Sequence, residues 1–176
     1  MRFPLYHSTL LAICLIGVSC LLPSACSEQA SESNPVETPF GKVISATGCK
    51  SFQHPADAAG AAQSCVQYRY DAGRRVLELT HENAGFNCCP EEIGADITVD
   101  GGLIVISEWE RSAPCDCNCL YDVEMLVEHL QPGAYTLSFE EPYRSSDDME
   151  LRFAIDLSTE PEGRICVPRT HYPWGM

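Results

Sequence analysis

The chain has 176 residues, with 11 basic and 25 acidic side chains and a formal charge of −14. This length favours a single domain, and the acidic balance argues against binding to nucleic acid and against attraction to anionic lipid. The sequence contains no motif of a phosphate-binding loop, a zinc protease or a nucleophile elbow.

Residues 1–25 have the pattern of a bacterial signal peptide. Arg2 is the only firmly charged residue among them, and an apolar run follows from Leu10 to Leu22. That run is shorter than a comfortable membrane span and suits the apolar core of a signal sequence. The sequence therefore predicts export, with an uncleaved N-terminal anchor helix as the alternative.

The segment Leu22–Cys26 resembles a bacterial lipobox, in which small residues precede a cysteine that becomes the lipidated N-terminus. It departs from the usual motif at Pro23, and a poorer match ends at Cys20. Residues 26–39 are polar, acidic and proline-containing, a composition typical of a disordered tether. The resemblance implies a lipid (palmitate) anchor on Cys26. Several acyl chains on one cysteine would attach the protein stably to a membrane. The serine that follows this cysteine resembles the outer-membrane sorting pattern.

Short β-rich segments separated by turn residues fill residues 40–176. The expected strands are Lys42–Ala46, Cys65–Tyr70, Arg75–Asn83, Ala95–Val99, Leu103–Glu110, Cys117–Leu130, Tyr135–Glu140, Met149–Leu157 and Arg164–Pro168. Asp100-Gly101-Gly102 is a strong hairpin signal, Leu130–Leu137 resembles a hairpin of Ig-like sandwiches, and Ala-rich Pro55–Gln63 is expected to be helical or irregular. Strands of this length and spacing predict an all-β domain, an Ig-like antiparallel β-sandwich.

Alternation along two of these segments predicts which side chains face the core. Leu77, Leu79 and His81 share one apolar face, so His81 is expected to be a hydrogen-bonded core histidine. From Cys115 to His129 every odd position would face inward, unless a bulge changes the phase.

Eight cysteines remain after the predicted processing, since Cys14 and Cys20 leave with the signal peptide and Cys26 takes lipid. They are Cys49, Cys65, Cys88, Cys89, Cys115, Cys117, Cys119 and Cys166. An even number of cysteines in a small exported domain predicts a disulfide framework.

Strand geometry restricts how these cysteines can pair. Cys49 and Cys65 flank the Ala-rich stretch, and we expect them to close a local loop. The remaining six then form two facing sets, Cys88, Cys89 and Cys166 against Cys115, Cys117 and Cys119. Neighbours in C-x-C-x-C spacing on one strand face have parallel Cβ directions and should not pair with each other.

A metal site is the alternative interpretation of the cysteine cluster. Cys115, Cys117 and Cys119, with His81, Cys88 or Cys89 nearby, have the ligand types that hold Zn²⁺ or Cu⁺. An oxidising compartment favours disulfides over free thiolates, so no cofactor is expected. A thiol–disulfide exchange protein is a third interpretation, and no C-x-x-C motif supports it.

The carboxylates indicate no enzyme. Glu108 and Glu110 share a strand face, where acidic residues on the solvent side explain them more simply than a glycosidase pair. The pairs Glu140-Glu141 and Asp147-Asp148 are expected to be solvated turn residues.

Three motifs resemble a group of uncharacterised bacterial lipoproteins. They are Ala84–Pro90 (AGFNCCP), Cys115–Asp122 (CDCNCLYD) and His171–Gly175 (HYPWG). The resemblance spans most of residues 40–176 and implies no activity. The aromatic chain end is expected to dock as a clasp over the core.

These observations predict an exported lipoprotein of the bacterial cell envelope, in the outer membrane and facing the periplasm or the cell surface. Its β domain is expected to be non-catalytic and to bind an envelope protein partner or support an assembly. The alternative is a metal-binding envelope protein that uses the cysteine cluster together with His81 or His171.

Overall fold

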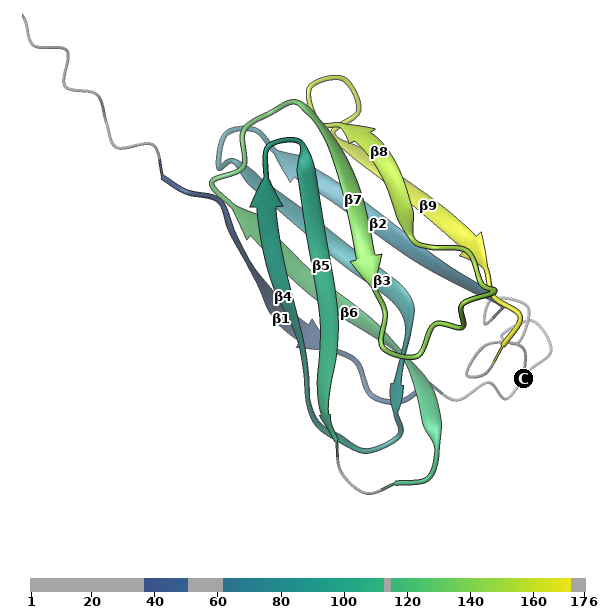
Figure 1. The fold of residues 1–176 in the computed structure, drawn as a ribbon. Coiled ribbons are helices and arrows are strands. Elements are labelled where there is room, and N and C mark those ends of the chain that lie inside the picture. Colours follow the sequence, from purple (N-terminus) through teal and green to yellow (C-terminus); the bar gives the residue numbers. More distant parts are fainter. Residues whose placement is uncertain (1–36, 51–61, 113–114, 172–176) are drawn as a thin grey trace, which may run out of the picture. The chain divides into compact units, whose positions relative to one another are not determined.

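The computed structural model describes residues 37–50, 62–112 and 115–171, and these residues form nine strands in two facing sheets (Figure 1). The strands are β1 (Phe40–Ala46), β2 (Gln63–Asp71), β3 (Val76–Asn87), β4 (Pro90–Asp100), β5 (Leu103–Ser112), β6 (Asn118–Glu128), β7 (Ala134–Glu140), β8 (Arg152–Asp156) and β9 (Glu162–Pro168). The predicted all-β sandwich is confirmed. Within these described ranges no helix is long and apolar enough to cross a membrane.

The two sheets differ in how their strands pair. One sheet has the order β1-β6-β3-β2-β9, and all its neighbouring strands are antiparallel. The other has the order β4-β5-β7-β8, in which β5 and β7 are parallel. The chain between β5 and β7 passes through β6 of the opposite sheet, so these two strands meet in the same direction. The last strand, β9, returns to the first sheet and lies beside β2, away from its neighbour in sequence, β8.

Alternating apolar side chains from both sheets form the core between them. Leu77 and Leu79 of β3 and Val123, Met125 and Val127 of β6 are almost fully buried. They face Ile104 and Ile106 of β5 and Leu137 of β7 across the sandwich, in one continuous cluster. The predicted inward phase is confirmed for Leu77–His81 of β3 and for the odd positions from Cys119 to Val127. It is wrong before β6, where Cys117 is exposed.

A bulge in β3 changes which residues of that strand face inward. The register with β6 shifts between Glu82 and Ala84, and Asn83 has a positive φ of 61°. Asparagine tolerates this left-handed conformation better than most residues, and its side-chain amide donates to the Gln63 carbonyl at 2.8 Å. The inward positions are odd-numbered before the bulge and even-numbered after it, so Phe86 is also buried.

The hairpin between β4 and β5 forms where the glycine signal predicts it. Asp100 pairs with Leu103, and Gly101 takes a positive φ of 55° that suits a residue without Cβ. The expected helical or irregular stretch, Pro55–Gln63, lies outside the described residues except for its last two positions, Ala62 and Gln63, and Gln63 begins β2. The predicted signal peptide, lipid anchor and most of the tether also lie outside them.

Candidate functional site

All eight cysteines of the predicted framework are joined in disulfides. The pairs are Cys49–Cys119, Cys65–Cys166, Cys88–Cys117 and Cys89–Cys115. As predicted, the three cysteines in C-x-C-x-C spacing pair with other segments and not with each other.

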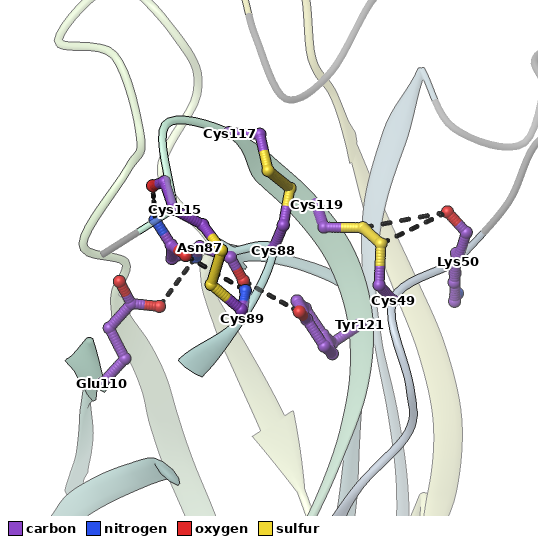
Figure 2. Close-up of a disulfide and its surroundings, with 10 residues drawn as sticks. All are labelled: Cys49, Lys50, Asn87, Cys88, Cys89, Glu110, Cys115, Cys117, Cys119 and Tyr121. Carbon is purple, nitrogen blue, oxygen red and sulfur yellow. Dashed lines mark hydrogen bonds between the residues drawn. A yellow bond between two sulfur atoms is a disulfide. The ribbon is translucent and has the colours of Figure 1, made fainter. Parts of the chain in front are cut away.

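Three of these bridges gather where β3 ends and β4 begins, and they form what we call the disulfide cluster (Figure 2). The adjacent residues Cys88 and Cys89 reach Cys117 and Cys115, which precede β6. The Cys88 amide also donates to the Cys117 carbonyl at 3.0 Å. The third bridge ties Cys49, just after β1, to the beginning of β6.

Asn87 is the polar centre of the disulfide cluster (Figure 2). Its side-chain amide donates to the Cys115 carbonyl at 2.7 Å, and its side-chain oxygen accepts from the Cys89 amide at 3.0 Å. Its own backbone amide donates to the Glu110 carboxylate at 2.7 Å, and its carbonyl accepts from the Tyr121 hydroxyl at 2.8 Å. One buried asparagine therefore holds both bridged segments in register.

The predicted pairing of Cys49 with Cys65 is wrong, and so is the predicted pairing of Cys166 with one of the three C-x-C-x-C cysteines. Cys65 lies directly opposite Cys166 in the β2–β9 ladder, with their Cα atoms 4.0 Å apart. Cys49 therefore forms its disulfide with Cys119, and not with Cys65, the next cysteine in the sequence. The sequence did not reveal that β9 crosses over to lie beside β2, and only that adjacency decides the pairing.

The structure brings the cysteines of the alternative metal site together as disulfides and not as metal ligands, and it places His81 away from them. Cys115, Cys117 and Cys119 are all oxidised in disulfides, whose sulfurs are not the thiolates that Zn²⁺ or Cu⁺ requires. His81 pairs with Val123, four residues along β6 from Cys119, a separation of roughly 13 Å. Across the described ranges no group of three or more His, Cys, Asp or Glu side chains is arranged to hold a metal ion.

A second polar region surrounds His81, which is fully buried on β3. Its ring atom Nδ1 lies 2.7 Å from Glu108 Oε1 of β5, and Nε2 lies 2.7 Å from Ser64 Oγ of β2. The ring also meets the edge of Phe139, with centroids 5.1 Å apart. The predicted hydrogen-bonded core histidine is confirmed, and it joins three strands from both sheets.

Two further charged side chains extend this region toward the chain end. Glu141, just after β7, places Oε1 3.8 Å from the Nε2 atom of His81. Arg169, just after β9, donates from Nη2 to Glu141 Oε2 at 2.5 Å. Because the side chains of His81, Glu108, Glu141 and Arg169 are all at most 1% exposed, we call them the buried charged quartet.

Opposing influences set the protonation of this quartet. Burial by itself lowers the pKa of His81, but the carboxylates of Glu108 and Glu141 outweigh it, so that pKa is raised above its ordinary value. Burial raises the pKa of Glu141, and the neighbouring His81 and Arg169 offset only part of that effect. Both shifts make His81 and Glu141 hold their protons to higher pH in the folded chain than in the unfolded chain.

The segment after β9 is fastened to the rest of the domain. The Arg169 amide donates to the Ala62 carbonyl at 2.8 Å, and its guanidinium also donates to the Met149 carbonyl. Asp148 accepts from the amide and the hydroxyl of Thr170 at 3.2 and 3.0 Å, and it lies 3.3 Å from His171. Residues 169–171 thus form a C-terminal clasp, while the aromatic residues 172–176 lie outside the described residues.

Three carboxylates predicted to face solvent are buried instead. Glu108, Glu141 and Asp148 hold His81, Arg169 and Thr170 respectively. Sequence reasoning also missed Ser64 and Arg169, because no motif or spacing marks a hydrogen-bond partner that arrives from another strand.

Ser64, His81 and Glu108 have the hydrogen-bond order of a serine hydrolase triad. A nucleophile must meet its substrate, yet Ser64 and His81 have no exposed surface. The arrangement can hold protons and charge inside the domain, and it gives a substrate carbonyl no access to the hydroxyl.

Comparison of the chain with protein-family models, with curated proteins and with solved structures finds no match.

Proposed function

We propose that this chain is an exported lipoprotein of the bacterial cell envelope whose β-sandwich is a non-catalytic binding or structural module. A lipid on Cys26 anchors it to the outer membrane, and residues 26–39 let the domain stand off the membrane to meet an envelope protein partner. Nucleic acid is not a partner of so acidic a chain.

The observation that carries this proposal is the complete pairing of the eight cysteines. Disulfides form and persist in oxidising compartments, and they stabilise small domains that build a limited core. Residues 1–25, which resemble a signal peptide, would direct export to such a compartment. A lipid on Cys26, at the segment that resembles a lipobox, would then anchor the protein to the membrane there.

The buried charged quartet supports a non-catalytic module. Its side chains converge between the two sheets and are sealed from solvent. Removing one member of such a sealed group destabilises the fold, and side chains with no exposed surface do not meet a substrate. The resemblance to uncharacterised bacterial lipoproteins agrees with a role in the envelope.

Lipidation tests the anchoring step directly. We would express the full chain in a Gram-negative host with a labelled fatty acid and compare Cys26→Ser with Cys20→Ser. We expect the unchanged chain and Cys20→Ser to carry label and to sediment with outer membrane, and Cys26→Ser to lose both. Equal labelling of all three chains, or label lost only in Cys20→Ser, would contradict the proposed anchor.

A further inference from the structure

The buried charged quartet contains two carboxylates and one permanent cation. Glu108 and Glu141 supply the carboxylates and Arg169 the guanidinium. A neutral His81 would leave one uncompensated negative charge inside the sandwich, where unbalanced charge is strongly unfavourable. A protonated His81 makes the group electrically neutral.

The ring contacts agree with a protonated His81. A carboxylate only accepts hydrogen bonds, so the Nδ1 atom that faces Glu108 at 2.7 Å carries a hydrogen. Nε2 faces the hydroxyl oxygen of Ser64 at 2.7 Å and a carboxylate oxygen of Glu141 at 3.8 Å. Both environments suit a donating nitrogen.

Among the described residues, the other neighbours of His81 named by strand register and ring contact are uncharged. Val66 of β2 and Val123 of β6 are its register partners, and Phe139 of β7 packs on the ring. The charge balance around His81 is therefore set by Glu108, Glu141 and Arg169.

We propose that His81 is an imidazolium in the folded domain and that the loss of its proton at alkaline pH opens the C-terminal clasp. Deprotonation leaves Glu108 and Glu141 sharing a single cation. Glu141 lies beyond the end of β7, in the connection to β8, so it is the carboxylate that can turn outward to water. Arg169 is bonded to it and to the Met149 carbonyl of the same connection, and residues 169–171 move with that guanidinium.

The direction of the pH effect follows from linkage. A histidine whose folded pKa lies above its unfolded value adds stability below the unfolded pKa, and that stability is lost as pH rises through the folded pKa. His81 is in this class. Glu141, whose pKa is also raised, acts in the same direction. The clasp is thus closed below the folded pKa of His81 and opens as pH rises through it.

Nuclear magnetic resonance of the full chain with labelled histidines tests both parts. The His81 resonance, assigned by through-bond correlation to its own backbone in the unchanged chain, should titrate above the ordinary pKa of 6.5. The protection factors of the Arg169 and Thr170 amides, corrected for the intrinsic pH dependence of exchange, should fall about tenfold per pKa unit of coupling, with the same midpoint.

Two variants separate this device from a general loss of structure. Glu108→Gln removes one negative charge and should lower the titration midpoint of His81, whereas His129→Gln, at a histidine paired with exposed Glu37, should leave it unchanged. A neutral His81 at pH 7, or amide protection at 169–170 that does not follow the His81 titration, would overturn the proposal. These readings need only the unchanged chain, so a variant that fails to fold does not remove the test.

Discussion

The disulfide cluster and the buried charged quartet fasten the domain by different physical means. The cluster joins the β3–β4 turn to the segment before β6 with covalent bonds, which restrict the unfolded chain whatever the pH. The quartet joins β3, β5 and the segments after β7 and β9 through charges whose balance depends on one proton. The first responds to reductant and the second to pH, so each region can be weakened while the other stays intact.

The two regions also differ in how far the sequence alone predicts them. A cysteine has few roles in an exported domain, so eight of them predict bridges before any fold is known. A glutamate or an arginine has many roles, and most of them are on the surface. The quartet therefore becomes visible only when the strands are placed.

The largest expected effect comes from the bridge that closes the longest chain segment. Cys65–Cys166 spans 101 residues, and replacing both cysteines with alanine should lower the free energy of unfolding by about 4 kcal/mol. Denaturant unfolding under non-reducing conditions measures it. A loss below about 1 kcal/mol would show that the β2–β9 ladder does not depend on its bridge.

Breaking the quartet should have the next largest effect. Arg169→Met leaves Glu141 buried without its guanidinium and should destabilise the domain by about 3 kcal/mol, because an uncompensated buried charge is left. Arg164→Met is the matched control, since Arg164 pairs with Glu82 at the surface and should change stability by less than about 1 kcal/mol. Equal losses in the two variants would mean that burial of the quartet gives it no special weight.

A smaller effect is expected from the inner bridge of the cluster. Cys89–Cys115 closes 26 residues, but the neighbouring Cys88–Cys117 bridge already restrains that segment in the unfolded chain. Replacing Cys89 and Cys115 with alanine should therefore cost only about 2 kcal/mol, against roughly 3.5 for an isolated bridge of this length. A loss as large as that from the Cys65–Cys166 replacement would contradict the chain-entropy account.

The smallest effect concerns the clasp at acid pH. Burial raises the pKa of Asp148, but hydrogen bonds from Thr170 and contact with His171 outweigh it and lower that pKa. The stability it adds is present above the unfolded pKa of about 3.8 and is lost as pH falls through the folded value. Asp148→Asn should destabilise by about 1 kcal/mol at pH 7 and flatten the acid side of the stability curve. An unchanged acid side would remove Asp148 from that dependence.

The sequence was sufficient to predict where most strands lie, but not which strands and side chains they contact. Nine strands were predicted and nine are present among the described residues, yet β4 begins at Pro90 rather than at Ala95. Its first half was not predicted as a strand, because it contains two glutamates and Gly94, which are uncommon in strands. That glycine belongs in the strand because the Trp109 ring lies against it, and a Cβ there would come within 2.2 Å of the ring. The sequence of a single strand does not predict such a contact with a side chain of another strand.

The sequence could not show which face of a strand points into the core where both faces are apolar. In β5 Leu103 and Val105 alternate with Ile104 and Ile106, so the sequence alone cannot tell which set is inward. The structure buries Ile104 and Ile106, and Glu108 follows on the same face. That two-residue period carries Glu108 to His81, and it is why a glutamate expected in solvent lies in the core.

The thiol state of the protein tests the central claim most directly. We would purify the chain from an oxidising compartment, alkylate it under denaturing conditions and measure its intact mass, then map the bridged peptides. The four bridges predict no alkylated residue among Cys49–Cys166, a mass eight hydrogens below the reduced form, and linked peptides that join Cys65 to Cys166 and Cys49 to Cys119. Several free thiols with retained zinc or copper in the native mass would contradict the account and make the cysteine cluster a metal site.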